Sequence, residues 1–156
     1  MGIRFPVPVD KDVLDSLNYM RKCAYRRSMV RELIKATKAL SDETRLRILN
    51  LVIQRECCVC EVMQALNISQ TRSSRNLSIL YDAGFFRQRK EGLWSLYSLK
   101  ENLPEYLEKM VEGVKSALVN NQTAQADLER LNLAVRTGMA CLPGSSRCCS
   151  GNVKAS

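Results

Sequence analysis

The stretch N-I-S-Q-T-R-S-S-R-N-L, residues 67–77, joins two segments whose apolar residues have helical spacing. Residues 67–69 form a tight connection, because asparagine and serine are residues that cap helices. The pattern predicts a short helix over residues 57–66 and a second helix over residues 70–83. Two helices joined by a three-residue turn are typical of a helix-turn-helix.

The second predicted helix has two different faces. Leu77 and Leu80 lie on its apolar side, and Gly84 stands where a left-handed C-terminal cap is expected. The polar side offers hydrogen-bonding groups for base edges and guanidinium groups for phosphates or guanine. We therefore expect this side to enter a groove of DNA through Gln70, Thr71, Arg72, Ser74 and Arg75.

The next segment, F-F-R-Q-R-K-E-G-L-W-S-L-Y-S-L over residues 85–99, predicts a β-hairpin. Two β-prone runs flank the Glu-Gly pair at residues 91–92, where glycine can take the positive φ of a two-residue turn. Arg87 and Arg89 share one face and Lys90 lies at the tip, so these cations are expected on DNA phosphates. The alternative is a charged strand face that protects an edge of the sheet.

Helical spacing also predicts helices over about residues 12–24, 29–40, 41–55, 104–118 and 123–136, with Ser41 as the N-cap of the third. The expected fold is mainly α with a two-stranded β-hairpin, a winged helix-turn-helix. Such a domain cannot cover this much additional apolar surface, so we expect the first and last helices to pair across the two-fold axis of a homodimer. Packing of these helices within one monomer is the alternative.

Three segments are expected along the chain. Residues 1–10 form an N-terminal extension, and residues 11–137 form the DNA-binding and dimerisation domain. Residues 138–156 contain cysteines, are rich in glycine and serine, and have no periodicity, so a flexible tail is predicted.

The net charge of the 156-residue chain is +8, and it is unevenly distributed. Residues 1–100 contain 18 Lys and Arg against 10 Asp and Glu, whereas residues 101–156 contain six of each kind. A positive field over the first two thirds suits double-stranded DNA, although the same surplus can simply solvate a surface.

No apolar run reaches the length of a membrane span, and residues 1–10 lack the pattern of a signal peptide. We therefore expect a cytoplasmic protein without a membrane partner. Thiols stay reduced in the cytosol, so the seven cysteines favour metal or redox chemistry over a disulfide scaffold.

Four blocks, over residues 38–51, 56–62, 69–77 and 89–97, resemble the ArsR/SmtB family of metalloregulatory repressors. The resemblance covers about residues 33–99. It implies a homodimeric winged-helix repressor that leaves its operator when a metal or metalloid binds. Ser73 and Asn76 depart from the residues frequent in the family, so the operator sequence is not implied.

The block E-C-C-V-C-E-V, residues 56–62, resembles the E-L-C-V-C-D-L element of the family's arsenic and cadmium sensors. The resemblance places Cys58 and Cys60 on the two metal-binding cysteines. Cys57 takes the place of the leucine, and Met63 stands where arsenic sensors of this type have a third cysteine. The third ligand is therefore open.

Soft thiolates select soft centres such as As(III), Sb(III), Cd(II) and Pb(II). The chain contains no histidine, which excludes imidazole-rich zinc sites. Arsenite is favoured because a trivalent centre needs only three thiolates, and a Cd(II)- or Pb(II)-responsive repressor is the alternative. Any single cysteine in this cluster can instead be a small buried hydrophobe.

In an ideal helix each residue turns by about 100°. Cys57 and Cys60 would then lie about 60° apart, whereas Cys58 and Cys60 would diverge by about 160°. Cys58 and Cys60 can bind one ion together only if the start of this helix is irregular or unwinds. We therefore expect ligand binding to distort this helix and to misalign the helix that reads DNA.

The candidates for a third sulfur are Cys57, Cys23 and the tail cysteines Cys141, Cys148 and Cys149. C-x-x-C at Cys57 and Cys60 also occurs in thiol oxidoreductases, but those enzymes use it at a strand-to-helix junction of a βαβ unit, which is not predicted here. We expect no enzyme. A repressor that responds to thiol oxidation is a further alternative.

Overall fold

The computed structural model describes residues 29–136. The chain divides into two units after residue 35, and residues 29–35 of the first unit are helical. The predictions for the N-terminal extension, the helix over residues 12–24, Cys23, the tail and its three cysteines lie outside the described residues.

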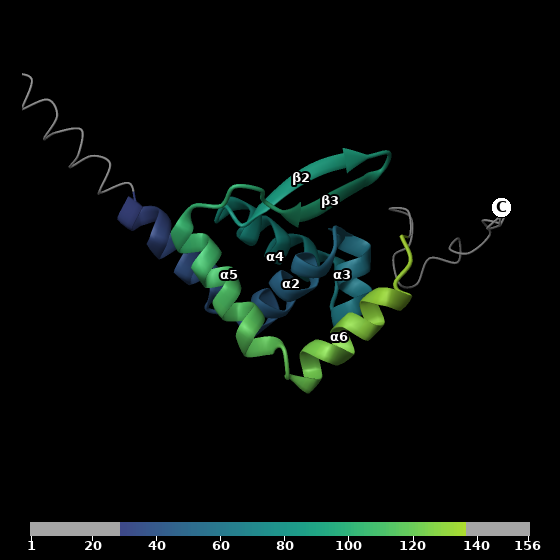
Figure 1. The fold of residues 1–156 in the computed structure, drawn as a ribbon. Helices are drawn as coiled ribbons and strands as arrows, with labels where there is room; N and C mark the ends of the chain where they lie inside the picture. Colours follow the sequence, from purple (N-terminus) through teal and green to yellow (C-terminus); the bar gives the residue numbers. More distant parts are fainter. Residues whose placement is uncertain (1–28, 137–156) are drawn as a thin grey trace, which may run out of the picture. The chain divides into compact units, whose positions relative to one another are not determined.

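The second unit contains a short helical segment, residues 36–40, followed by eight elements (Figure 1). In chain order they are α2 (Glu43–Gln54), β1 (Cys57–Cys58), α3 (Val59–Leu66), α4 (Gln70–Asp82), β2 (Phe86–Glu91), β3 (Trp94–Leu99), α5 (Glu105–Leu118) and α6 (Gln122–Leu133). None of the helices in the described part has the length and apolar character needed to cross a membrane.

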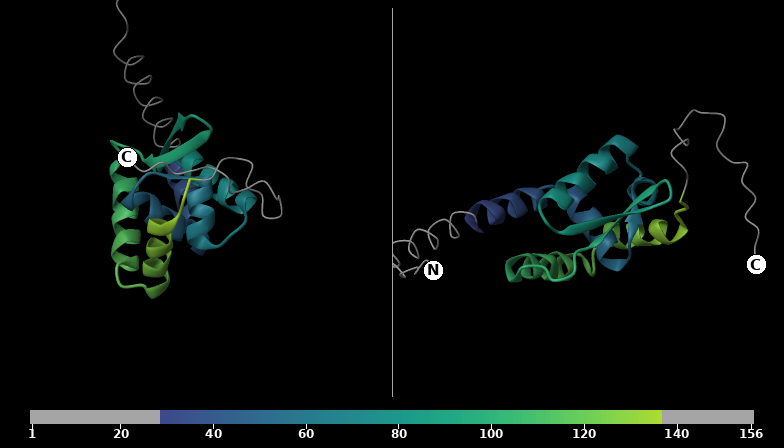
Figure 2. Two further views of the ribbon diagram at one scale, coloured as in Figure 1. Left: turned by 90° about the vertical axis from the view of Figure 1, so that its right-hand side faces the viewer. Right: turned by 90° about the horizontal axis from the view of Figure 1, so that it is seen from above.

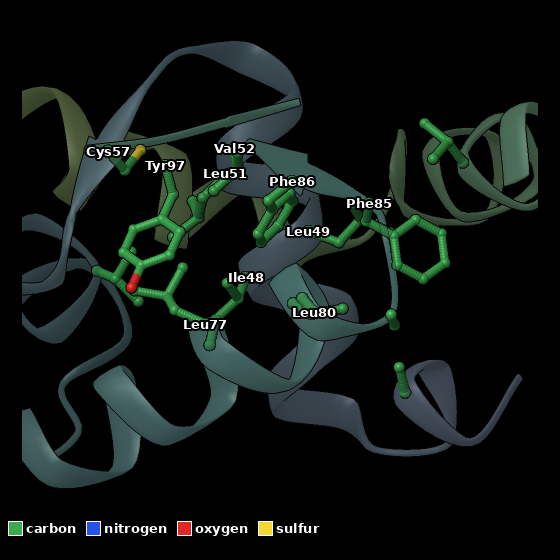
Figure 3. Packing of buried hydrophobic residues seen from close by; sticks show 14 of the residues in the cluster. Ile48, Leu49, Leu51, Val52, Cys57, Leu77, Leu80, Phe85, Phe86 and Tyr97 are labelled. Carbon is green, nitrogen blue, oxygen red and sulfur yellow. The ribbon is translucent and has the colours of Figure 1, made fainter. Parts of the chain in front are cut away.

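The core of this unit forms around α2, which contacts α3, α4, α5 and α6. Ile48 and Leu49 of α2 are fully buried, as are Leu77 and Leu80 of α4, which the sequence places on the apolar side of that helix. Figure 3 shows these four side chains in one cluster with Tyr97 of the sheet. The amphipathic pattern of α4 is thus explained by its packing on α2.

The helix-turn-helix is confirmed. Asn67 ends α3 in the left-handed conformation, with φ 53°, and the hydroxyl of Ser69 accepts a hydrogen bond from the N–H of Arg72 at 3.3 Å as the N-cap of α4. Gly84 has φ 89°, so the predicted left-handed position after α4 is also confirmed. These two positive φ values reverse the chain on both sides of α4.

The wing differs from the prediction in two respects. The sheet has three strands in the order β1-β3-β2, because residues Cys57 and Cys58 pair with Tyr97 and Leu96 of β3 instead of starting a helix. Glu91 pairs with Trp94, so the turn is at residues 92–93, one residue later than predicted. Gly92 still provides the positive φ, here 57°. In the left-hand view of Figure 2, the hairpin of β2 and β3 extends beyond the helices of this unit.

Two helix boundaries differ from those predicted from the sequence. Asp42, not Ser41, is the N-cap of α2, because its carboxylate accepts a hydrogen bond from the N–H of Arg45 at 3.1 Å. Helix α6 ends at Leu133, three residues earlier than predicted. The other predicted C-terminal helix is confirmed as α5.

Candidate DNA interface and thiol site

The polar side of α4 faces solvent as predicted. Thr71, Ser74 and Arg75 are exposed and, together with the half-buried Gln70, line one surface depression. Arg72 is also exposed, but its Nη2 donates to the hydroxyl of Thr44 on α2 at 2.8 Å. This hydrogen bond directs one end of Arg72 toward α2. Arg75 is then the cation of this helix that makes no such contact with residues 29–136.

The wing cations differ in their partners. Arg87 donates to the hydroxyl of Ser98 at 2.8 Å and forms an ion pair with Glu101 at 2.8 Å. Arg89 forms ion pairs with two carboxylates, which are described below. Within residues 29–136, Lys90 has no ion-pair partner. Arginines that pair with carboxylates in this way fit the predicted alternative of a strand face that protects its edge.

The cysteine segment begins as a strand and continues as a helix. Cys57 and Cys58 belong to β1, and Cys58, with φ −93° and ψ 170°, is the N-cap of α3. Because successive side chains of a strand point to opposite faces, the thiols of Cys57 and Cys58 point apart. Because the backbone of Cys58 is extended and not helical, the helix start is irregular, as a joint role of Cys58 and Cys60 requires.

Cys57 points into the hydrophobic core. Its side chain is fully buried beside Tyr97 (Figure 3), and its Sγ donates to the carbonyl oxygen of Arg55 at 3.2 Å. Burial in these apolar surroundings raises the pKa of the Cys57 thiol to about 12. Cys57 therefore has the character of a small buried hydrophobe.

Cys58 and Cys60 are in contact with each other. A hydrogen bond with the thiol of Cys60, followed by burial, raises the pKa of the Cys58 thiol above its usual range. Cys58 is buried and Cys60 is half-buried. The Cys58 thiol is thus protonated near neutral pH, and the two sulfurs are directed toward one another.

Glu61 fixes the backbone at this point. Its buried carboxylate accepts a hydrogen bond from the N–H of Cys58 at 2.8 Å and forms an ion pair with Arg55 at 2.7 Å. Burial opposes ionisation of Glu61, but the hydrogen bonds from Cys58 and Arg55 outweigh it and lower the pKa of the carboxyl. Arg136, beyond α6, lies 3.4 Å from the same carboxylate.

Two sulfurs, but not three, are brought together. Among residues 29–136, no group of three or more His, Cys, Asp or Glu side chains is arranged to hold a metal ion. Cys58 and Cys60 fit a soft, thiophilic centre as two of its ligands. A third thiolate has to come from Cys57 after a rotation out of the core, or from a cysteine outside the described residues.

Sequence reasoning missed the charged side chains around this pair. Arg55 and Arg136 have no motif of their own. Arg55 is the C-cap of α2 and Arg136 follows α6, so their approach to Glu61 depends on the packing of α3 against both helices. The spacing Cys58-x-x-Glu61 is the one local signal, since it matches the S/T-x-x-E spacing of a capping box.

A three-stranded wing, a capped helix-turn-helix and a polar exposed face on α4 define a winged helix-turn-helix DNA-binding regulator. Residues 42–87 match the model of the family described as "Bacterial regulatory protein, arsR family". The chain is 38% identical over 95 residues to the arsenic resistance transcriptional regulator ArsR1 of Pseudomonas putida, an alignment that covers 60% of this chain and 73% of the relative. The chain belongs to the arsR family.

Two further comparisons extend this result. The chain is 32% identical over 99 residues to a cadmium resistance regulatory protein CadC homolog of Staphylococcus aureus, covering 63% of this chain and 78% of the relative. Among solved structures, the homodimeric winged helix-turn-helix DNA-binding domain of a possible ArsR-family regulator from Mycobacterium bovis is 25% identical. That alignment has a TM-score of 0.52 and covers 62% of this chain and 87% of the other.

Proposed function

We propose that this chain is a homodimeric transcriptional repressor that binds double-stranded operator DNA in the cytoplasm. As(III) or Sb(III) releases it by binding the thiols of Cys58 and Cys60. The observation that carries the proposal is the helix start at Cys58, which turns its thiol toward Cys60 at the first helix of the helix-turn-helix.

The position of the pair explains how a ligand would change DNA binding. Cys58 is the N-cap of α3, and α3 packs against α4, which presents the polar side toward DNA. A ligand that draws Cys58 and Cys60 onto one centre changes the N-cap geometry that Glu61 holds. Because packed helices move as units, the change reaches α4 and misaligns its exposed residues with the groove.

The protonated thiol of Cys58 favours arsenite over a divalent cation. Arsenous acid condenses with three thiols to give As(SR)3 and three molecules of water, so each thiol proton leaves on a hydroxide of the acid. Cd(II) or Pb(II) instead displaces a proton into solvent for every thiolate that it binds. The raised pKa of Cys58 therefore costs affinity for the divalent cations but not for arsenite.

A Cd(II)- or Pb(II)-responsive repressor is the second candidate, and the similarity to the CadC homolog supports it. A repressor that responds to thiol oxidation is disfavoured at Cys57 and Cys58. Oxidation proceeds through the thiolate, and the raised pKa values of Cys57 and Cys58 keep both thiols protonated near neutral pH.

The third sulfur has two possible origins in this proposal. Cys57 lies next to the pair but has to leave the core, whereas Cys23, Cys141, Cys148 and Cys149 lie outside the described residues. Serine substitutions of these five residues, one at a time, identify the source by loss of arsenite affinity.

The test is fluorescence anisotropy of labelled DNA from upstream of the protein's own gene, titrated with reduced protein. The proposal expects tight binding that micromolar arsenite abolishes. Cys58→Ser and Cys60→Ser are expected to bind DNA and to resist arsenite. Met63→Leu, which removes a thioether from the same helix, is the matched control and is expected to respond as the wild type does. Binding that ignores arsenite but responds to Cd(II) would transfer the assignment to the second candidate.

A further inference from the structure

A chain of ion pairs connects the cysteine segment with the wing. Glu56 accepts two hydrogen bonds from Arg89, at 2.8 Å from Nε and 2.5 Å from Nη2. Arg89 also lies 2.5 Å from Glu91 through Nη1. Glu91 lies 3.6 Å from Arg136, whose Nε is 3.4 Å from Glu61. The network thus begins and ends on the two glutamates that flank the cysteines.

The contact between Glu56 and Arg89 crosses the sheet. Glu56 immediately precedes β1, and Arg89 lies on β2, whereas the strand order is β1-β3-β2. No backbone ladder joins β1 to β2, so this side-chain pair is a direct link between the segment of Cys57 and Cys58 and the outer strand of the wing. Two parallel N–H···O bonds fix orientation as well as distance, which a single lysine contact does not do.

We propose that Glu56 is a positioning residue for the wing and that Arg89 serves this ion pair instead of contacting a DNA phosphate. The proposal has a second part, which rests on the proposed function. A ligand bound to Cys58 and Cys60 displaces Glu56, and the wing moves with Glu56. Arg89 was expected on DNA from the sequence, and the structure gives its guanidinium two carboxylate partners. The hydrogen bond from Arg89 also lowers the pKa of Glu56, which keeps this carboxylate charged.

The first test needs no ligand. DNA affinity of the reduced full-length chain is measured as a function of salt for Glu56→Gln, Arg89→Ala, Arg89→Lys and the double variant Glu56→Gln/Arg89→Ala. We expect each single variant to lower affinity by the same factor, about twofold to fivefold, and the double variant to lose no more than either single one. Arg89→Lys should behave as Arg89→Ala, because lysine cannot form the two parallel bonds.

The slope of the logarithm of DNA affinity against the logarithm of salt concentration distinguishes the two roles of Arg89. A positioning residue leaves the slope unchanged, whereas loss of a phosphate contact reduces it by about one. Lys90→Ala, on the same strand and without an ion-pair partner among the described residues, is the comparison and is expected to reduce the slope. If Arg89→Ala reduces the slope, adds to Glu56→Gln, and is rescued by lysine, the proposal is overturned.

The second test follows the wing itself. Trp94 is the only tryptophan of the chain and pairs with Glu91 at the tip of the hairpin. In the wild type, arsenite is expected to change the fluorescence of Trp94. The Glu56→Gln variant is expected to bind arsenite as well, but to show at most half of the fluorescence change seen in the wild type. An unaltered change in Glu56→Gln overturns the coupling. If arsenite and Cd(II) leave the wild type unchanged and bound to DNA, the proposed function fails, while the ligand-free test still decides the role of Arg89.

Discussion

At the scale of single residues, Asp127 of α6 is a buried carboxylate that pairs with two arginines. Its side chain is fully buried and accepts hydrogen bonds from Arg47 of α2 at 2.6 and 2.7 Å and a further one from Arg130. Asp127→Ala leaves two guanidinium groups without this partner. Because Arg47 and Arg130 are partly exposed, we expect a loss of about 2 kcal/mol in the free energy of unfolding, below the range for a fully buried pair.

Urea unfolding followed by circular dichroism measures this loss. Glu129→Gln, an exposed acidic substitution two residues along the same helix, is the control and should change the free energy by less than about 0.5 kcal/mol. Equal values for the two variants would show that the pairs with Asp127 do not stabilise the fold.

The thiol pKa values of Cys57 and Cys58 make a second prediction at this scale. Both pKa values are raised in the folded chain, so both thiols carry protons below about pH 9. Cd(II) has to displace these protons, and its apparent affinity should therefore rise with pH, by up to about tenfold per pH unit for each proton. Arsenite releases water, and its affinity should stay nearly constant over the same range.

DNA-release titrations with each ligand at about pH 6.5, 7.5 and 8.5 measure the two slopes. A Cd(II) midpoint that does not move with pH would mean that the binding sulfurs are already thiolates. A steep arsenite slope in that range would contradict the water-releasing reaction.

At the scale of elements, the turn of the helix-turn-helix depends on one backbone conformation. Asn67 has φ 53° and ψ 50°, and its side chain is exposed, so it contributes geometry and no packing. Asparagine and glycine tolerate this conformation better than alanine does. We expect Asn67→Ala to cost about 1 kcal/mol and Asn67→Gly to be near neutral, measured by thermal unfolding. If the two substitutions had equal costs, the left-handed conformation would not limit stability.

The same elements show what the sequence could predict. Helix α4, its cap at Ser69 and the left-handed Gly84 follow from local patterns, because a helix is stabilised by neighbours in the chain and by one apolar face. Strand β1 could not be predicted, since two residues have no periodicity and the pairing partner Tyr97 is far along the chain. The sequence therefore predicts helical geometry for Cys57 and Cys58. Their side chains instead follow the alternation of a strand, so the predicted directions of their thiols are wrong.

The charged contacts of the candidate site are likewise non-local. Glu56 and Arg89 are separated by 33 positions, and Arg47 and Asp127 by 80. In the sequence, nothing distinguishes these four residues from charged residues that lie on the surface. Their pairing depends on the way the wing and α6 fold back onto the centre of the domain, which composition and spacing do not encode.

At the scale of the whole molecule, the predicted homodimer determines how the two copies of α4 reach DNA. Two-fold related recognition helices fit successive major grooves when they are about 34 Å apart, so operator binding and dimerisation are linked. Leu133, at the end of α6, is 82% exposed when residues 29–136 are considered. The prediction that the last helix pairs with a second copy accounts for this exposure.

We therefore expect Leu133→Ser to weaken the dimer and, through it, the affinity for an operator with two half-sites. Sedimentation velocity over a dilution series should show monomer at concentrations where the wild type is dimeric. Leu93→Ser is the matched control, because Leu93 is 73% exposed at the tip of the wing, away from the predicted interface, and its loss should leave the oligomeric state unchanged. If Leu133→Ser remained dimeric at every concentration, the copies would have to meet through a surface other than the end of α6.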